Sequence, residues 1–439
     1  MRKRVLLLNP PIYDFTAYDF WIKPLGLLTV AGRLNGIVDL TLFDYLDRCH
    51  PSVANASCSR ELWSKGRFNS IRIEKPAIFS SIPRYFHRFG LDRAIFQQFL
   101  RENAPFDFVL VQTVMTYWYL GIVEAIEDVR SLCPDASIVL GGPYATICPD
   151  HCRTLGADLV VEGSDLAPLW QHMAVTPSAS QIPYYRGYPK LKSAAIKLTD
   201  GCPFDCTYCC AGRLFSGFTA RPPAESIRIL EYLCSLGVND IAFYDDALLY
   251  QPENALAPFL EYVIEKGIKV NFHTPNGLHS RFIDAELAKL MVRAGFKTFH
   301  LGFEIASGDW QKQTGSKVFS DELTSSAKFL LSAGANPAGI TAYQILGHPH
   351  SSPAQMEDSM RLANSLGIRI MLSDFSPIPG TPDGQYCQKW IDLTEPLNHN
   401  KTAFAITLWG DDQVNRLKKL CKTLNNKIVG SDRQPPRKT

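Results

Sequence analysis

The N-terminal part of the chain alternates short apolar runs with stretches in which apolar residues recur at helical spacing. The apolar runs cover residues 5–8, 38–43, 108–111, 138–142 and 158–161, and the helical patterns between them include residues 25–34 and 121–133. Strands that are apolar throughout are buried on both faces, as in parallel sheets whose strands are connected by helices. We therefore predict a doubly wound, Rossmann-like α/β sheet over residues 1–173, with a ligand site beyond the carboxyl ends of its strands.

A second series of strand and helix patterns begins at residue 193. Its strand patterns cover residues 195–199, 241–244, 268–272, 298–303, 339–346 and 368–372, and its helical patterns include 224–236, 284–294, 320–332 and 354–366. Such unbroken alternation is typical of a TIM-type strand-helix barrel, complete or partial, whose functional residues follow the strands. We assign residues 193–385 to this barrel and the proline-containing stretch 174–192 to a linker. Residues 386–439 form a C-terminal extension, expected to be loose from about residue 425.

An insert at about residues 49–104 interrupts the first series. Its basic residues are Arg60, Lys65, Arg67, Arg72, Lys75, Arg84, Arg88, Arg93 and Arg101. One helix is predicted in it, over residues 91–102, and a stretch this long without sheet periodicity is usually functional or a lid. The basic side chains either face solvent or close over an anionic ligand. A nucleic-acid partner would depend on this insert alone.

Composition narrows the class of protein. With 46% hydrophobic and 20% charged residues in 439, the chain is globular and long enough for two cores. Its 45 basic and 43 acidic residues give a formal charge of +2, so nucleic acid and anionic membranes are not expected partners. The apolar run 5–8 ends at Asn9-Pro10-Pro11, too short for a secretory leader or a membrane span, which predicts a cytoplasmic protein.

Three cysteines directly after the first barrel strand carry the candidate chemistry. Cys202, Cys206 and Cys209 lie within eight residues, on a loop tight enough to converge on one point. Three thiolates suit three irons of a cubane cluster and leave the fourth iron without a protein ligand. Structural zinc needs four ligands, normally as two separated pairs, and no second pair follows here. The adjacent Cys210 is a poor fourth ligand because neighbouring side chains point apart.

The Cys-x3-Cys-x2-Cys spacing, with Tyr208 before the last cysteine, resembles the signature of the radical S-adenosylmethionine (radical SAM) superfamily. The core of that family is a partial (β/α)6 barrel. The resemblance implies a 4Fe-4S cluster on Cys202, Cys206 and Cys209, with S-adenosylmethionine (SAM) bound to the open iron through its amino and carboxylate groups. It also implies an electron donor such as flavodoxin or ferredoxin, whose electron cleaves SAM to a 5'-deoxyadenosyl radical.

The resemblance further implies a SAM site on the barrel. Tyr208 matches the aromatic residue near the adenine. Asp245 and Asp246 resemble the acidic motif for the methionyl amine, although the family's commoner Gly-Gly-Glu is absent. Glu304 and Ser307 correspond to the ribose and carboxylate contacts. For the acids, the alternative reading is N-capping of the next helix.

The fifth barrel strand carries a further part of that resemblance. Ile345 and Gly347 fall on the adenine motif, where Tyr343 replaces a glycine and His350 replaces a glutamate. These two departures weaken the expected adenine contact. Histidines near the strand ends invite a search for a general base, but none is assigned, and the catalytic residues stay unknown.

The N-terminal sheet resembles the cobalamin-binding-type domain that precedes the barrel in one large radical SAM subgroup. The resemblance lies in Leu8 to Pro11, Pro24 to Leu27, Gly141-Gly142-Pro143 and Glu162-Gly163. It implies a nucleotide tail near the glycine pair and a corrin near residues 113–117. The implied cobalamin contacts are Asn9, Pro10, Pro11, Thr113, Met115, Tyr117, Gly141, Gly142, Glu162 and Gly163. The Asp-x-His-x-x-Gly sequence that gives cobalt a histidine does not occur, and the alternative is a sheet kept for substrate or packing.

Together these resemblances imply a cobalamin-dependent radical SAM methyltransferase that transfers a methyl group to an unactivated carbon. The alternatives are a cobalamin-independent radical rearrangement, cyclisation or carbon-sulfur bond formation, and an iron-sulfur protein without turnover. The last would need a fully ligated cluster. We expect a small-molecule or peptide substrate, and no motif identifies it.

Overall fold

The computed structural model describes residues 2–53 and 62–430. Its N-terminal part is a five-stranded parallel sheet in the order β3-β1-β6-β7-β8. The strands are β1 (Arg4–Asn9), β3 (Asp39–Asp44), β6 (Phe108–Gln112), β7 (Ser137–Gly141) and β8 (Leu159–Val161). This confirms the predicted doubly wound sheet. The order reverses between β1 and β6, so the loops after these two strands border the crevice in which such sheets bind ligands.

Alternation along β1 explains the two cores of this sheet. Val5 and Leu7 pack on one face with α1 (Leu25–Leu34) and α6 (Ala167–Met173). Leu6 and Leu8 pack on the other face with α2 (Arg93–Asn103) and α3 (Tyr119–Leu132). All four side chains are fully buried. Each such burial contributes roughly 1.5–3 kcal/mol, so an uninterrupted apolar run suits a central strand covered by helices on both faces.

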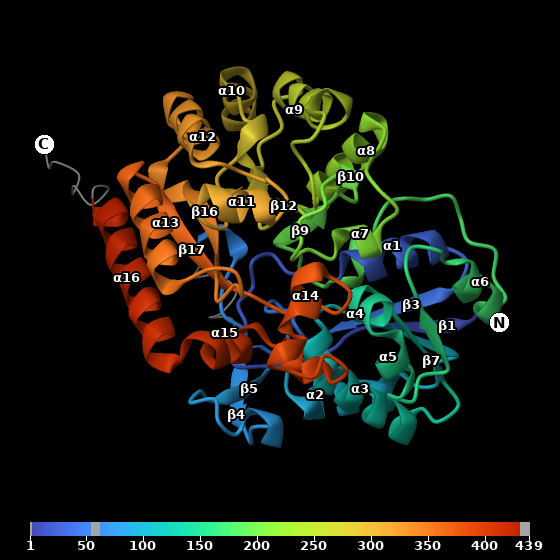
Figure 1. The fold of residues 1–439 in the computed structure, drawn as a ribbon. Coiled ribbons are helices and arrows are strands. Elements are labelled where there is room, and N and C mark those ends of the chain that lie inside the picture. The colour runs from blue at the N-terminus through green and yellow to red at the C-terminus, as the bar shows by residue number, and fades with distance from the viewer. Residues whose placement is uncertain (1, 54–61, 431–439) are drawn as a thin grey trace, which may run out of the picture.

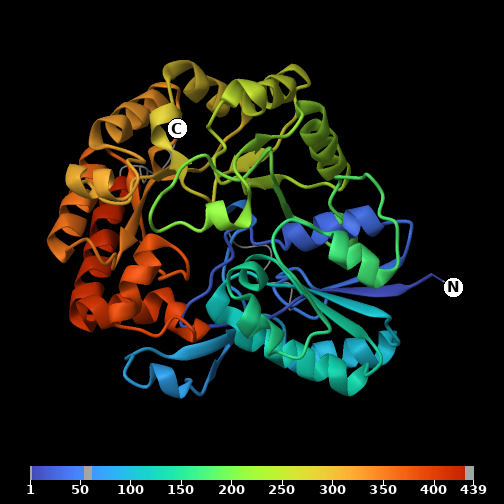
Figure 2. The same ribbon diagram turned by 45° about the vertical axis from the view of Figure 1, so that its right-hand side comes forward.

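The second part of the chain is an arc of parallel strands covered by helices on its outside (Figures 1 and 2). One sheet has the order β13-β12-β9 and the other β14-β15-β16-β17. The strands are β9 (Ser193–Ile196), β12 (Asp240–Phe243), β13 (Asn271–His273), β14 (Leu278–His279), β15 (Phe299–Gly302), β16 (Ile340–Leu346) and β17 (Arg369–Asp374). The outer helices are α8 (Pro223–Ser235), α9 (Leu256–Glu265), α10 (Ala285–Ala294), α12 (Ser320–Ser332) and α13 (Pro353–Ser365). The predicted partial barrel is therefore confirmed.

Segments of the N-terminal domain pack against the inner side of the barrel strands. Trp21 is fully buried and stacks on His273 of β13, with ring centroids 4.1 Å apart. Its backbone oxygen accepts a hydrogen bond from the Tyr244 hydroxyl at 2.6 Å, and the Ser64 hydroxyl donates to Asp240 Oδ2 at 2.6 Å. The two domains thus share one buried interface. The largest hydrophobic core of the molecule includes residues of both.

The insert at residues 49–104 contains structure that its sequence does not predict. Its strand β5 (Phe86–Phe89) pairs antiparallel with both β4 (Ser70–Ile73) and β2 (Ile12–Asp14). The predicted helix is confirmed as α2, shifted by two residues at its start. Two of its arginines pair with acids of α3: Arg88, which is buried and so fits neither prediction, forms a bidentate pair with Glu124, at 2.6 and 2.8 Å, and the partly exposed Arg93 pairs with Asp128. Arg60 lies outside the described residues.

The C-terminal extension is ordered further than predicted. It begins at the end of α14 (Pro382–Tyr386) and contains α15 (Lys401–Trp409) and α16 (Asp411–Gly430), and α16 packs along α13 and β17. The prediction of a loose tail from about residue 425 is therefore wrong as far as Gly430. Residues 431–439 lie outside the described part. The polar composition of α16 misleads because only one of its faces, with Val414, Leu417, Cys421 and Leu424, is buried.

Asn425 is a polar residue of α16 that binds the edge strand β17. Its side chain accepts from the backbone N–H of Ile370 and donates to the backbone oxygen of the same residue, both at 2.8 Å. Asn425→Ala should lower the free energy of unfolding by about 2 kcal/mol, because two buried backbone groups lose their partner. Chemical denaturation of the full chain measures this. Asn426→Ala, a change at the adjacent exposed position, is the control, and equal losses in both variants would contradict the interpretation.

Within the described residues, no helix is both long and apolar enough to cross a membrane.

Candidate active site

The cysteine loop begins at a short antiparallel pair of strands, which holds its first residue in place. It follows β10 (Thr199–Asp200), which pairs antiparallel with β11 (Thr219–Ala220). Arg221 closes this ribbon with two hydrogen bonds to Asp200, at 2.7 and 2.9 Å. Gly201 has φ +73°, and a Cβ there would lie 1.8 Å from the backbone oxygen of Gly217. Only glycine therefore permits the turn that leads into Cys202.

The two acids after β12 have different environments. Asp245 is buried, and its Oδ1 accepts three hydrogen bonds: from the N–H groups of Leu198 and Thr199 and from the Thr199 hydroxyl. Burial raises the pKa of Asp245 to about 6. Asp245 therefore holds the strand that leads into the cysteine loop. Asp246 is half-buried, and its Oδ2 lies 3.5 Å from Lys197 Nζ without a hydrogen bond from the part of the chain that the structure describes.

Neither acid caps the next helix. Helix α9 begins after Ala255, which provides no side-chain cap. The N-capping alternative is therefore wrong for Asp245 and Asp246. It does hold for Ser307, whose hydroxyl accepts from the N–H of Trp310 at the start of α11 (Gly308–Gln313). The predicted contact of Ser307 with SAM stays a prediction.

The three predicted ligand cysteines carry free thiols on one tight loop. The Cys209 N–H donates to the backbone oxygen of Cys206 at 3.0 Å. Burial raises the pKa of the Cys206 thiol to about 11, and the nearby Cys209 adds to that rise. Cys209 also contributes to the raised pKa of Cys202, after burial, so all three thiols lie within electrostatic reach of one another.

The donor set fits a cluster better than a single ion. Among the described residues, no three His, Cys, Asp or Glu side chains are arranged as ligands of one metal ion. Each cysteine of a cubane binds a different iron, so a cluster does not require such an arrangement. Gly315 packs closely against the cysteine loop, because a Cβ at this position would lie 3.0 Å from the Cα of Cys206. The three thiols thus lie on one loop, with Cys209 within electrostatic reach of both other cysteines.

Glu304 and Lys317 form a buried ion pair beside the cysteines. Glu304 follows β15, is only 2% exposed, and accepts from Lys317 Nζ at 2.6 Å through Oε1. Its Oε2 is buried and receives no hydrogen bond from any described residue. Burial opposes the charge on Lys317, but Glu304, Cys206 and Cys209 outweigh it and raise the pKa of the lysine above its ordinary value. Glu304 thus keeps one oxygen open toward the cysteine loop.

Lys317 is a site residue that sequence reasoning missed. It lies in the loop between α11 and α12, in no recognised motif. A Cβ on Gly302 would lie 2.8 Å from Lys317 Nζ, so the glycine before Phe303-Glu304 makes room for the lysine. That glycine is the one signal in the sequence that points to a close neighbour.

The structure separates the residues of the predicted adenine region. The Tyr208 ring stacks on Trp310, with centroids 6.0 Å apart and planes at 21°. Tyr208 also packs against the small apolar cluster that contains Ile345 and Phe404. Gly347 has φ +80°, and a Cβ there would lie 2.8 Å from the Cβ of Ala405 in α15. Ile345 therefore stays beside Tyr208, whereas Gly347 is needed for the packing of α15.

Half of the predicted cobalamin contacts lie at the carboxyl ends of β6 and β7. The Thr113 hydroxyl donates to the Gly141 backbone oxygen at 3.0 Å and accepts from the N–H of Ala145. Gly142 has φ +119°, and a Cβ there would lie 2.3 Å from the Thr113 backbone oxygen. The glycine pair thus lets two loops meet. A Cβ on Gly163 would meet nothing within 4 Å, so this turn leaves room beside the sheet.

The other predicted cobalamin contacts differ in exposure. Met115 is 38% exposed, although it follows the central strand β6. Tyr117 is buried, and Asn9 donates to Asp44 Oδ1 at 2.6 Å. The last members of the set are Pro10, Pro11 and Glu162, of which Pro11 contacts Gly121 and Glu162 pairs with Arg153. An exposed apolar residue and open backbone at a sheet's ligand-binding end fit a large cofactor. None of the ten predicted contacts is a histidine that could bind the cobalt.

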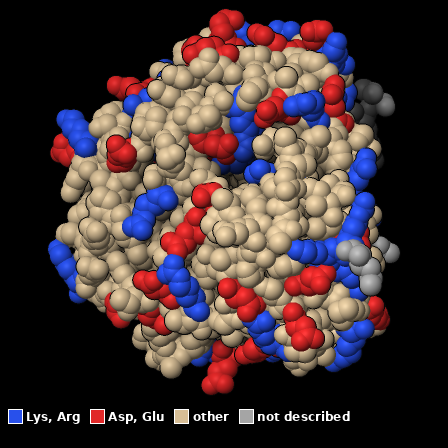
Figure 3. All heavy atoms as spheres, turned by 90° about the vertical axis from the view of Figure 1, so that its right-hand side faces the viewer, with Lys and Arg blue, Asp and Glu red and all other residues tan. Residues whose placement is uncertain are grey.

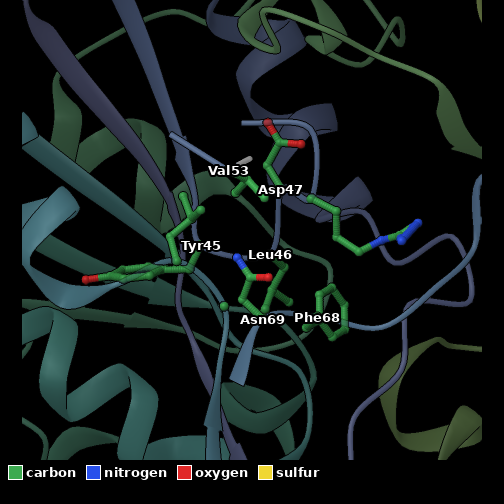
Figure 4. Close-up of a pocket in the computed structure, with 9 residues that line it drawn as sticks. Tyr45, Leu46, Asp47, Val53, Phe68 and Asn69 are labelled. Carbon is green, nitrogen blue, oxygen red and sulfur yellow. The ribbon is translucent and has the colours of Figure 1, made fainter. Parts of the chain in front are cut away.

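Two hollows can be described in the molecule. Figure 3 shows a recess in the middle of one face, with basic and acidic side chains at its rim. A separate hollow above β3 is lined by Tyr45, Leu46, Asp47, Arg48, Val53, Phe68, Asn69, Gly90 and Leu91. Figure 4 shows Tyr45 and Asp47 pointing in different directions in this hollow. It contains none of the predicted site residues.

Comparison with known proteins identifies the barrel. Residues 196–363 match the model of the radical SAM superfamily. The threonylcarbamoyladenosine tRNA methylthiotransferase MtaB of Thermotoga maritima is 26% identical over 281 residues, 60% of this chain and 64% of MtaB. An uncharacterized methyltransferase of Synechocystis is 26% identical over 242 residues, 49% of this chain and 44% of that protein. The chain thus matches less than two thirds of the length of either relative.

Solved structures extend the likeness to both domains. The radical SAM methyltransferase TsrM of Kitasatospora setae, solved with cobalamin and a [4Fe-4S] cluster, has a TM-score of 0.62 at 14% identity, covering 89% of this chain and 78% of TsrM. The cobalamin-dependent SAM radical enzyme OxsB, solved with aqua-cobalamin, has a TM-score of 0.53 at 10% identity, covering 95% of this chain and 61% of OxsB. At these identities the likeness shows the fold: an N-terminal sheet followed by a partial barrel.

Proposed function

We propose that this chain is a radical SAM enzyme, as the match of residues 196–363 to that superfamily's model supports, and that Cys202, Cys206 and Cys209 hold a 4Fe-4S cluster whose fourth iron binds SAM. When bound, the cluster supplies the electron that cleaves SAM to a 5'-deoxyadenosyl radical. The observation that carries the proposal is the placement of three free thiols on one loop, of which Cys206 and Cys209 act on the buried Glu304–Lys317 pair. The remaining side chains of the site bind and orient SAM.

We propose the following roles around SAM. Asp246, with an oxygen that accepts no hydrogen bond from the described residues, binds the methionyl amine. Glu304 offers its open Oε2 to the ribose, and Lys317 balances the negative charge of the thiolates and of the SAM carboxylate. Tyr208 and Ile345 provide an apolar surface for the adenine, which they shield from water.

We further propose that the N-terminal sheet binds cobalamin and that the enzyme transfers a methyl group to an unactivated carbon. Support comes from the fold likeness to TsrM and OxsB, and from the open backbone at Gly163 and the exposed Met115 at the ligand-binding end of the sheet. Cobalamin, when bound, supplies the methyl group. The sheet residues would hold its tail and face the barrel, so that substrate lies between the two domains.

A second candidate keeps the radical and omits cobalamin. It is favoured by the packing of Thr113, Gly141 and Gly142, which fill one another's space rather than an open groove. The reaction would then be a rearrangement, a cyclisation or carbon-sulfur bond formation.

The proposal defines the partners of the enzyme. The substrate is a small molecule or a peptide; TsrM has been solved with a tryptophan substrate and a SAM analogue. A one-electron donor such as flavodoxin or ferredoxin reduces the cluster. The thiols require a reducing compartment, which favours the cytoplasm.

The test is anaerobic reconstitution of the full chain with iron, sulfide and hydroxocobalamin, followed by reduction in the presence of SAM. We expect 5'-deoxyadenosine in solution and a corrin spectrum that survives gel filtration. Release of 5'-deoxyadenosine without retained corrin would select the second candidate. A chain that binds iron but releases no 5'-deoxyadenosine with any substrate tested would contradict both.

A further inference from the structure

The segment that follows the last barrel strand reaches back to the cysteine loop. Thr381 caps α14 by accepting from the N–H of Gly384 at 3.0 Å. A Cβ on Gly384 would lie 1.9 Å from the backbone oxygen of Ile378, so the turn is tight. This turn presents Asp383, which is 3% exposed, to the loop between Cys206 and Cys209. No motif in the sequence points to this contact.

Asp383 contacts Thr207 through both its backbone and its side chain. The Asp383 N–H donates to the Thr207 backbone oxygen at 3.1 Å, and the Thr207 hydroxyl donates to Asp383 Oδ2 at 2.6 Å. A hydrogen bond to a charged carboxylate is about twice as strong as a neutral one, and a buried carboxylate is costly to leave unpaired. Asp383 therefore restrains the residue that lies directly after Cys206.

The same carboxylate connects the loop to the surface on which Tyr208 packs. His348 is fully buried, and its Nδ1 accepts from Trp310 Nε1 at 3.2 Å, which leaves Nε2 as the proton donor to Asp383 Oδ2 at 3.0 Å. Trp310 in turn stacks on the Tyr208 ring. His350 Nε2 lies 3.3 Å from Asp383 Oδ1. The Asp383 side chain thus joins the cysteine loop to the loop after β16, and through His348 to Trp310 of α11.

We infer that Asp383 is a positioning residue which, through Thr207 and His348, fixes the cysteine loop and the Tyr208 ring in one arrangement. The consequence of this inference rests on the proposed function: SAM binds to an iron site and an aromatic surface that are already in place before it arrives. Preorganised binding groups give affinity because their ordering cost is met on folding rather than on binding. Loss of the Thr207–Asp383 bond should therefore weaken SAM binding while the barrel stays folded.

Thr207→Val removes the hydroxyl at nearly constant volume, and Thr207→Ser retains it. Thr394→Val is the matched control, because Thr394 also donates its hydroxyl to an aspartate, Asp392, but on an exposed surface. Two measurements are made on each full-length variant. Hydrogen exchange of the metal-free protein reports on residues 201–214 without any cluster. Electron paramagnetic resonance and SAM titration of the reconstituted protein report on the site.

We expect Thr207→Val to speed amide exchange over residues 201–214 and to weaken SAM binding, each by about tenfold, at unchanged iron content. Thr207→Ser and Thr394→Val should match the parent protein. Unchanged exchange in Thr207→Val would overturn the inference, as would equal impairment of Thr207→Ser, which would assign the effect to packing. If the parent protein binds no iron, or if its cluster signal does not change when SAM is added, the proposed function fails. Hydrogen exchange of the metal-free variants still decides the role of Asp383.

Discussion

Cys206→Ala is expected to leave a folded protein that retains no 4Fe-4S cluster and releases no 5'-deoxyadenosine from SAM. The change removes the central member of the three thiols, and a cubane with two protein ligands has two open irons instead of one. The fold should survive because the loop is held by the Asp200–Arg221 pair and by Asp383, not by Cys206. Iron and sulfide analysis, the optical spectrum and SAM cleavage under reducing conditions measure the result.

Cys210→Ala is the matched control for this prediction. Cys210 directly follows the last proposed ligand and is half-buried like Cys202 and Cys206. Its variant should keep the cluster and its response to SAM. A Cys210→Ala protein without a cluster would mean that this cysteine is a fourth ligand. The fourth iron of the cluster would then have no open position for SAM. That result would favour the alternative of an iron-sulfur protein without turnover.

The strands and helices of this chain were predictable because the hydrophobic pattern and the tertiary structure agree. The run 5–8 became β1 with both faces buried, and the helical spacing over residues 320–332 became α12 with the same bounds. The insert was different. Its strand β4 is exposed along most of its length, so no alternation marks it, and the pairing of β5 with β2 crosses a long stretch of sequence.

The candidate site was predictable only where its residues occupy a spaced motif. Cys202, Cys206 and Cys209 carry such spacing, and so do Asp246 and Glu304 at strand ends. Lys317 and Asp383 carry none, because each reaches the cysteines across the fold from a loop or a short helix. Long-range contacts of this kind leave no local pattern, since the partners are more than a hundred residues away along the chain.

Buried ion pairs explain a second group of features that the sequence did not predict. The basic insert resembled a surface for solvent or anions, yet Arg88 and Arg93 pair with Glu124 and Asp128 of α3. The partners of these arginines are the two acids of α3 that are buried, although acids in a helix normally face water. Glu124 is 4% exposed and Asp128 3%. Charge runs predict solvent exposure only when no opposite charge is buried beside them.

Lys317→Met should lower the free energy of unfolding by about 3 kcal/mol and reduce SAM cleavage by roughly a hundredfold. The stability loss follows because the variant leaves Glu304 charged and buried, with neither oxygen paired. The activity loss follows because the cation also faces the charges of Cys206 and Cys209. Denaturation curves and 5'-deoxyadenosine release measure the two effects. Lys312→Met, an exposed lysine in α11, should change neither.

The double variant Glu304→Gln, Lys317→Met separates the two roles of the lysine. If Lys317 only neutralises Glu304, removing both charges should restore stability and SAM cleavage together, as expected for an isolated pair. The proposed site predicts a split result instead: stability returns to within about 1 kcal/mol of the parent, because no unpaired charge is left buried. SAM cleavage stays low, because the thiolates and the SAM carboxylate still lack their cation. Recovery of both properties would remove Lys317 from the site and leave it a structural partner of Glu304.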